Sequence, residues 1–264
     1  MKKIILAVCI LFSLLPIWGT YTVTVVSYNV GVFSKYVKDS SPEVAEMMHE
    51  VNADLIGLCE LDSCSVFRND RRDQLKEFVS HMGEGWTGHF GKAMGFGGGG
   101  YGVGAVAGPR LKVERSSTIA LPKLDGSEPR AAAVLETDRL IFACCHLDYT
   151  QGEARLKQAE ILTRELKEYF RKTQKPVILC GDFNAKPDNP TMDYLRKYWD
   201  IVSPYDPSFP SGKPDRCIDY VMVLKGSCRH RVVGRAGVRA KFKFGDPATA
   251  SDHLPVVVKL RIHQ

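Results

Sequence analysis

Short apolar runs rich in β-branched residues recur along this 264-residue chain, and most of them stop at a polar side chain. The run at 177–180 is typical, because it passes through a glycine to Asp182 and, one residue after Phe183, to Asn184. Such a run predicts a strand buried on both faces, where a charge is unfavourable. Alternation around Phe183 lets Asp182 and Asn184 point the same way. The segment is therefore either an active-site rim at a strand end or a solvated turn.

Strands and helices alternate irregularly along the rest of the chain. Further strands are predicted at residues 21–30, 53–59, 111–120, 130–136, 139–145, 218–224 and 254–262. Helices are predicted at residues 41–51, 74–82, 152–172 and 191–198. The glycine-rich segment 95–108 is expected to run from a flexible loop into a strand of small residues. No internal linker is long or polar enough to divide the chain, so residues 21–264 are expected to form a single mixed α/β domain.

Residues 1–20 have the build of a secretory signal peptide. Lys2 and Lys3 precede an apolar run at 4–17, and Gly19 and Thr20 follow it. The run is short for a membrane span, although an uncleaved anchor is the alternative. No other segment could cross a bilayer, so we expect an exported protein, periplasmic or secreted, with no integral span after signal removal.

Charge and cysteine content limit the classes of partner. Loss of residues 1–20 removes two lysines and no acid, so the formal net charge falls from +6 to +4, which suits an anionic substrate without indicating one. The absence of a CxxC pair argues against a cysteine-based zinc site. Cys144, Cys145 and Cys180 lie in apolar runs and are interpreted as small buried hydrophobic residues. Two disulfides, Cys59–Cys64 and Cys217–Cys228, stay open, because sequence does not settle connectivity.

Polar groups able to bind a hard cation or to move a proton follow several of the predicted strands. They are Asn29, Glu60, His146, Asp182, Asn184 and Asp219, together with Asp252 and His253 just before the last strand. Carboxylates, amides and imidazoles placed together at strand ends are costly to bury unless they neutralise one another or hold a metal ion. The pattern therefore predicts a single polar site built from distant parts of the chain.

Hydrolysis of a phosphoester is the chemistry that this set of side chains suits. The oxygen ligands Glu60, Asn29 and Asp252 fit Mg²⁺, with Mn²⁺ as a substitute, and such an ion stabilises charge on phosphoryl oxygens. The other roles are proton handling and phosphate binding: Asp182 to orient and deprotonate water, Asn184 to steady the reacting phosphoryl group, His253 oriented by Asp219, and Arg130 to hold a phosphate.

The motifs also carry a resemblance. YN at 28–29, LCE at 58–60, GYGVGAVA at 100–107, CHLD at 145–148, GDFN at 181–184, IDYV at 218–221 and SDHLPV at 251–256 stand in the order seen in the endonuclease/exonuclease/phosphatase superfamily. This DNase I-like group includes repair nucleases, neutral sphingomyelinases and inositol polyphosphate 5-phosphatases. The resemblance implies a four-layer α/β/β/α sandwich of two packed, mixed but mostly antiparallel sheets, with the site at one edge.

Position by position, the resemblance implies the same roles. Asn29, Glu60 and Asp252 match metal ligands; Asp182 and Asn184 match the pair at water and phosphate; Asp219 and His253 match the dyad. His146 matches a second histidine of the DNase I and sphingomyelinase branches. Gly31 stands where repair nucleases often have an additional acid, so the chain resembles a dedicated abasic-site enzyme less well.

Several residues have an ordinary structural interpretation beside the functional one. His146 could be a satisfied strand-end histidine, Arg130 is open, and Tyr101 either faces substrate or only packs. Gln158 and Arg155 are expected to pack under the loop that contains Asp148. The basic run 229–244 could follow an anionic polymer, although Lys241–Phe244 also has the alternation of a half-buried edge strand.

The expected function is an exported, Mg²⁺-dependent phosphoric ester hydrolase, acting as a monomer on a compact sugar, inositol or lipid phosphate. A secreted DNase I-like nuclease is the alternative, although nucleic acid is not favoured, because the long loop at 203–215 carries a single lysine. A catalytically silent binding module is a third interpretation, which is disfavoured because no catalytic position carries an inert residue.

Overall fold

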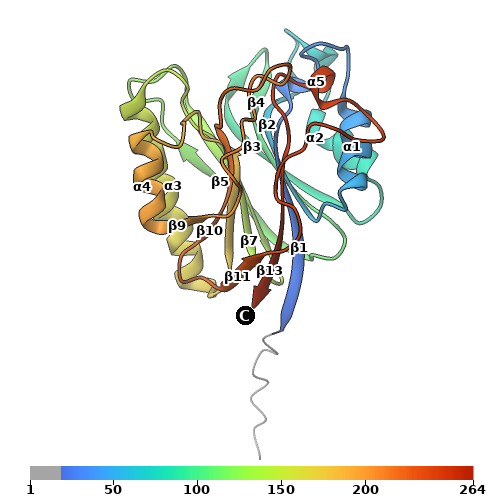
Figure 1. The fold of residues 1–264 in the computed structure, drawn as a ribbon. Coiled ribbons are helices and arrows are strands. Elements are labelled where there is room, and N and C mark those ends of the chain that lie inside the picture. Colours follow the sequence, from blue (N-terminus) through green and yellow to red (C-terminus); the bar gives the residue numbers. More distant parts are fainter. Residues whose placement is uncertain (1–18, 264) are drawn as a thin grey trace, which may run out of the picture.

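The computed structural model describes residues 19–263, and the predicted signal peptide falls almost entirely outside them. Two sheets pack face to face, and helices cover both outer faces (Figure 1). The strands of the first sheet lie in the order β11-β13-β1-β2-β4-β3, with β12 paired to β13, and those of the second in the order β5-β6-β7-β8-β10-β9. Only β1/β2 and β7/β8 pair in parallel, whereas the other neighbours are antiparallel. The expected four-layer α/β/β/α sandwich is confirmed.

The strands have the following bounds. They are β1 (Thr20–Asn29), β2 (Leu55–Ser63), β3 (Thr87–Phe96), β4 (Gly99–Ala107), β5 (Val113–Leu121), β6 (Arg130–Thr137), β7 (Ile141–His146), β8 (Val177–Asp182), β9 (Trp199–Ile201), β10 (Asp219–Leu224), β11 (Arg229–Val232), β12 (Gly237–Val238) and β13 (Val256–His263). The helices are η1 (Gly31–Phe33), α1 (Ser41–Glu50), η2 (Asn69–Arg71), α2 (Gln74–Met82), α3 (Gly152–Thr173), α4 (Pro190–Tyr198) and α5 (Pro247–Ala250).

Three apolar layers hold these elements together. One lies between the two sheets, with Val25, Phe142 and Val221 among its fully buried members. The second packs α3 and α4 on the second sheet, and the third packs α1 and α2 on the first. Because strands in the middle of both sheets are covered on both faces, they are apolar along their length, which is why their runs were readable in the sequence.

The structure differs from the sequence interpretation where strands are exposed. The glycine-rich segment is a β3/β4 hairpin with only Gly97 and Gly98 in the turn, not a flexible loop. Strand β3 was not predicted, because it is only partly buried and has no apolar period. The segment 241–244, whose alternation also fits a half-buried edge strand, is not a strand, and Phe242 packs against the apolar layer between α1, α2 and the first sheet.

The cysteines within residues 19–263 are all free. Cys144, Cys145 and Cys180 are fully buried, as predicted. None of the seven cysteines in the described part of the chain is in a disulfide, so neither pairing left open by the sequence is formed. Cys59 is buried between the sheets, whereas Cys64 is exposed beyond the end of β2.

Candidate active site

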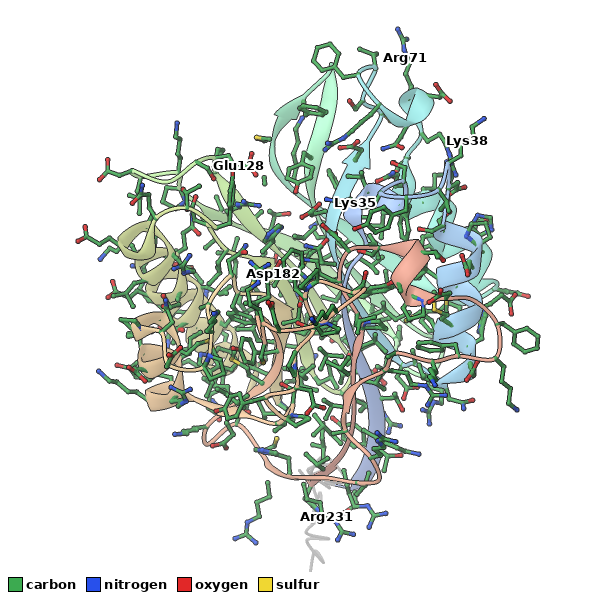
Figure 2. All side chains as sticks on the ribbon, turned by 45° about the horizontal axis from the view of Figure 1, so that its top comes forward. Lys35, Lys38, Arg71, Glu128, Asp182 and Arg231 are labelled. Carbon is green, nitrogen blue, oxygen red and sulfur yellow. The ribbon has the colours of Figure 1, made fainter. Side chains whose placement is uncertain are left out.

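Polar side chains from both sheets meet at one end of the molecule. The parallel pairs β1/β2 and β7/β8 each bring two carboxyl ends side by side, and such ends are frequent positions for ligand sites. Asn29 ends β1, His146 ends β7 and Asp182 ends β8. Figure 2 shows Asp182 near the middle of this end of the molecule, with Lys35 on the side of the first sheet and Glu128 on the side of the second.

Glu60 reaches the site because β2 is irregular there. The pairing of β2 with β4 shifts between Cys59 and Leu61, so Glu60 is the additional residue of a β-bulge, and its φ is +60°. Cys59 keeps its place between the sheets and Leu61 its place toward the helices. The bulge turns the Glu60 side chain toward the strand end, where Oε1 accepts a 3.0 Å hydrogen bond from Asn29 Nδ2.

The backbone at the end of β8 brings Asp182 and Asn184 together. Gly181 has φ +145°, and a Cβ on it would lie 1.9 Å from the carbonyl oxygen of Cys145, so this position requires glycine. Asp182 Oδ1 accepts a 2.8 Å hydrogen bond from the backbone N–H of Asn184, which has φ +48°. Asp182 still belongs to β8 and the chain turns only at Pro187 and Asp188, while the Asp182 side chain is only 2 % exposed and points into the site.

The other oxygen of Asp182 is the centre of the site. Its Oδ2 accepts a 3.1 Å hydrogen bond from Asn29 and lies 3.6 Å from Nε2 of both His146 and His253. Burial and the nearby Asp219 carboxylate raise the pKa of Asp182 to about 7, against the opposing effects of His253 and the hydrogen bonds. A carboxylate with such a pKa suits a general base at neutral pH.

His253 and Asp219 form the expected pair. His253 Nδ1 donates a 2.8 Å hydrogen bond to Asp219 Oδ2, which also accepts from Ser208 Oγ at 2.6 Å. Burial favours the neutral imidazole, but the charges of Asp219 and Asp182 and this hydrogen bond outweigh it and raise the pKa of His253 to about 9. The ring of Phe209 covers the imidazole at a centroid distance of 4.6 Å. His253 is therefore a cation at neutral pH, with its second N–H directed at Asp182.

The surroundings of His146 favour the neutral form of its imidazole ring. Arg130 Nη1 lies 3.2 Å from Nδ1 of His146, and the side-chain amide of Asn184 lies 3.0 Å from Nε2. The contacting atom of Asn184 is Nδ2, so both ring nitrogens face N–H donors, and these contacts oppose a doubly protonated ring. Burial, with the charges of Arg130 and His253, keeps the pKa of His146 well below its usual range. Arg130 is only 3 % exposed and also pairs with Glu128 at 3.1 Å.

The carboxylates of the site fit a divalent cation. Asp252 Oδ1 is buried without a hydrogen-bond partner, and Glu60 forms no salt bridge within residues 19–263. Carboxylate oxygens without such partners destabilise the folded protein unless a cation neutralises their charge. Asn29 is turned differently from the expectation for a ligand, because its Oδ1 accepts from Gly31 N and its Nδ2 donates to Glu60 and Asp182. In this arrangement Asn29 orients the carboxylates of Glu60 and Asp182. The oxygens that face a metal ion are those of Glu60 and Asp252.

A second group of donors lies beside the first. One ligand atom each from Asp182, Asp219 and His253 lie within 4.8 Å of one another, and Asp219 Oδ1 is also buried without a partner. Nδ1 of His253 and Oδ2 of Asp219 already share a hydrogen bond, so this group is better suited to moving and holding protons.

A cavity of about 370 Å³ opens above these groups. It is lined by Glu60, Tyr101, Glu128, Arg130, His146, Tyr149, Asp182, Asn184, Phe209, Arg216, Ile218, Asp252 and His253. Tyr101 thus faces the cavity, with only 8 % of its surface exposed, and burial raises the pKa of its hydroxyl. Glu128, Tyr149, Phe209 and Arg216 were not predicted, because they lie in irregular segments whose sequence has no period that would place them.

Contacts outside the cavity confirm one further sequence prediction and reveal one residue that it missed. Gln158 Oε1 accepts from the backbone N–H of Asp148 at 2.8 Å, and Arg155 Nη1 donates to the carbonyl of Asp148 at 2.9 Å, so both residues pack under this loop as expected. Lys35, by contrast, was missed: its Nζ lies 2.7 Å from Asp252 Oδ2. A single lysine in a bend carries no sequence signal for such a contact.

The sandwich and its site define a class of enzyme, the metal-dependent phosphoester hydrolases. The family model described as endonuclease/exonuclease/phosphatase family matches residues 26–253, and this chain belongs to that family. No curated protein sequence matches the chain.

Solved structures with the same fold are numerous, and three illustrate the likeness. A mannosyl-6-phosphatase of Bacteroides thetaiotaomicron is 21 % identical with a TM-score of 0.71, over 90 % of this chain and 99 % of that chain. An endonuclease/exonuclease/phosphatase from Bacteroides vulgatus is 17 % identical with a TM-score of 0.73, over 92 % and 100 %. The catalytic domain of human Nocturnin, solved with a bound sulfate anion, is 19 % identical with a TM-score of 0.66, over 93 % and 97 %. At these identities the likeness shows the shared fold.

Proposed function

We propose that this protein is an exported, Mg²⁺-dependent phosphoesterase that hydrolyses a compact phosphorylated substrate, such as a sugar, inositol or lipid phosphate. The observation that carries the proposal is the carboxylate of Asp182, which lies 3.6 Å from two histidine nitrogens beneath a cavity of about 370 Å³. A cavity of this size suits a small phosphorylated group.

The chain's own residues supply proton movement and charge. Asp182 takes a proton from water as the water oxygen attacks phosphorus, and the bond to the leaving oxygen breaks. The cationic His253 donates its Nε2–H to a phosphoryl oxygen, and Asp219 keeps the ring charged and oriented. Arg130 and Asn184 stand at the same cavity as further donors for the phosphate.

A divalent cation would be held by Glu60 and Asp252, with Asn29 orienting Glu60. When bound, it neutralises charge that develops on the phosphoryl and leaving oxygens. Mg²⁺ is proposed because the donors are oxygens, and Mn²⁺ is expected to substitute.

Sugar phosphates lead the proposed substrates. The structural neighbour from Bacteroides thetaiotaomicron is a mannosyl-6-phosphatase, and Tyr149, Phe209 and Arg216 line the cavity here beside its charged groups. Nuclease activity is the second candidate, because the pair of His146 and His253 resembles the DNase I arrangement.

A substrate panel distinguishes these candidates. Plasmid DNA, RNA, sphingomyelin, inositol phosphates and sugar phosphates are incubated with the purified protein and Mg²⁺ at two salt concentrations. We expect phosphate release from a compact ester and little nicking of DNA. Efficient plasmid nicking that falls steeply as salt rises would make the protein a nuclease instead.

Export and a monomeric state belong to the same proposal. Lys2, Lys3 and the apolar run at 4–17 support export, and amino-terminal sequencing from the native host should find a start near residue 20. Within residues 19–263, no helix is long and apolar enough to cross a membrane.

Light scattering of the purified chain tests the expected monomer.

A further inference from the structure

Lys35 already places a positive charge at the candidate cation site. Its ammonium lies 2.7 Å from Asp252 Oδ2, and the side chains are 42 % and 16 % exposed, respectively. Within the described residues, Lys35 forms no other salt bridge. Asp252 Oδ2 therefore already pairs with a positive charge, the ammonium of Lys35.

The space for this lysine exists because residue 31 is glycine. A Cβ on Gly31 would lie 3.1 Å from Cβ of Lys35, 3.4 Å from its Cδ and 3.5 Å from Asp252 Oδ1. The aliphatic stem of Lys35 thus lies directly over Gly31, at the position where the sequence lacks an additional acid. No side chain at position 31 separates the lysine from the carboxylate.

The remaining oxygens have no such partner. Among the residues that the structure describes, Asp252 Oδ1 is buried without a hydrogen-bond partner, and Glu60 accepts a side-chain hydrogen bond from Asn29 alone. Glu60 and Asp252 line the same cavity, and we assign one divalent ion to the pair. A second would lie close to the Lys35 ammonium, and at about 4 Å like charges repel substantially even in a polar site.

We propose that the Lys35 ammonium occupies the place of a second cation, so that this site takes one divalent metal ion and binds it less tightly than the bare carboxylates would. This inference rests on the proposed function, in that the site is assumed to bind a divalent ion. Lys35 acts through Asp252 and is a positioning residue, because it does not line the cavity.

Direct measurement of Mn²⁺ binding tests the proposal without substrate. Calorimetric titration and the electron paramagnetic resonance signal of free Mn²⁺ give affinity and stoichiometry for the wild-type chain and three variants. Lys35→Gln removes the charge, Lys35→Arg keeps it, and Lys38→Gln removes an equal charge from an exposed lysine that points away from the site (Figure 2).

We expect one Mn²⁺ per wild-type chain. Loss of one charge beside the ion should tighten binding roughly tenfold in Lys35→Gln, or admit a second Mn²⁺. Lys35→Arg and Lys38→Gln should bind as the wild type does. Mn²⁺ should also raise the melting temperature of Lys35→Gln more than that of the wild type, since the metal ion then replaces the lost partner of Asp252.

Two results would overturn the proposal in different ways. Unchanged or weaker binding by Lys35→Gln, with a wild type that binds one ion, refutes the role of Lys35 and leaves the proposed function intact. A wild-type chain that binds no Mn²⁺ at millimolar concentration refutes the metal-dependent function, and the role of Lys35 with it.

Discussion

Asp182 is the residue on which the proposed chemistry depends most. We expect Asp182→Asn to lower turnover by about two to four orders of magnitude, as for loss of a positioned base, and His253→Ala to do the same. The site is more buried than the end of a strand usually is, because Asp182 is only 2 % exposed and His253 only 4 %. Asp182→Asn should still fold, because it removes a charge that burial disfavours. Steady-state kinetics beside thermal melting separates the two effects, and a folded Asp182→Asn variant with wild-type turnover would exclude Asp182 as the base.

Glu60 is tested by a change in metal requirement. Glu60→Gln keeps the shape and the hydrogen bond with Asn29 but removes the charge. The Mg²⁺ concentration needed for half-maximal activity should rise, while activity at saturating Mg²⁺ falls less. A metal titration that is unchanged from the wild type would show that Glu60 is not a ligand.

Asp148 links the stability of the loop after β7 to pH. Its oxygens accept hydrogen bonds from the backbone N–H groups of Ser127, Thr150 and Gln151. Burial opposes the charge, but these bonds together lower the pKa of Asp148 to about 2.

The folded pKa of Asp148 lies below that of the unfolded chain, so its stabilising effect is complete above about pH 4 and is lost as the pH falls toward 2. Asp148→Asn should cost about 1–3 kcal/mol at pH 7, and the difference from the wild type should shrink at pH 2–3. Urea unfolding at both pH values measures it. An equal difference at the two pH values would contradict this account.

At the scale of elements, the two sheets are tightly packed against each other at Gly57 of β2. A Cβ there would lie 2.2 Å from Cys180 Sγ and 2.9 Å from Cys144 Sγ, so two small cysteines of the second sheet fill the space that glycine leaves. Gly57→Ala should destabilise the fold by about 1–3 kcal/mol through overpacking.

Gly95→Ala is the matched control. Gly95 is also a strand glycine, but a Cβ there meets nothing within 4 Å, so its effect should be within about 0.5 kcal/mol. Equal melting temperatures for the two variants would show that the sheets can separate without cost at Gly57.

At the scale of the whole molecule, β1 joins the predicted export signal to the core. It starts at Thr20 and pairs with β13 on one side and β2 on the other, which places it inside the first sheet. A chain that starts at residue 20 should fold and melt as the full chain does, because no described strand is lost. A chain that starts at residue 25 lacks half of an interior strand and should be unfolded or insoluble. Circular dichroism of both decides, and a well-folded shorter chain would show that β1 is dispensable.

The strand ends show how far sequence determines this protein. The buried strands, the four longer helices and the residues Asn29, Glu60, His146, Asp182 and His253 were predictable, because apolar runs report burial and polar residues at their ends stand out. The partly buried strand β3 and the cavity residues Tyr149, Phe209 and Arg216 were not, since such strands and irregular segments carry no clear hydrophobic period. Only the tertiary structure decided that Asn29 donates to two carboxylates, that a bulge redirects Glu60, and that Lys35 pairs with Asp252. These contacts join residues far apart in the chain or depend on local backbone geometry, and side-chain direction at the end of a strand is set by neighbouring strands rather than by the residue's own sequence.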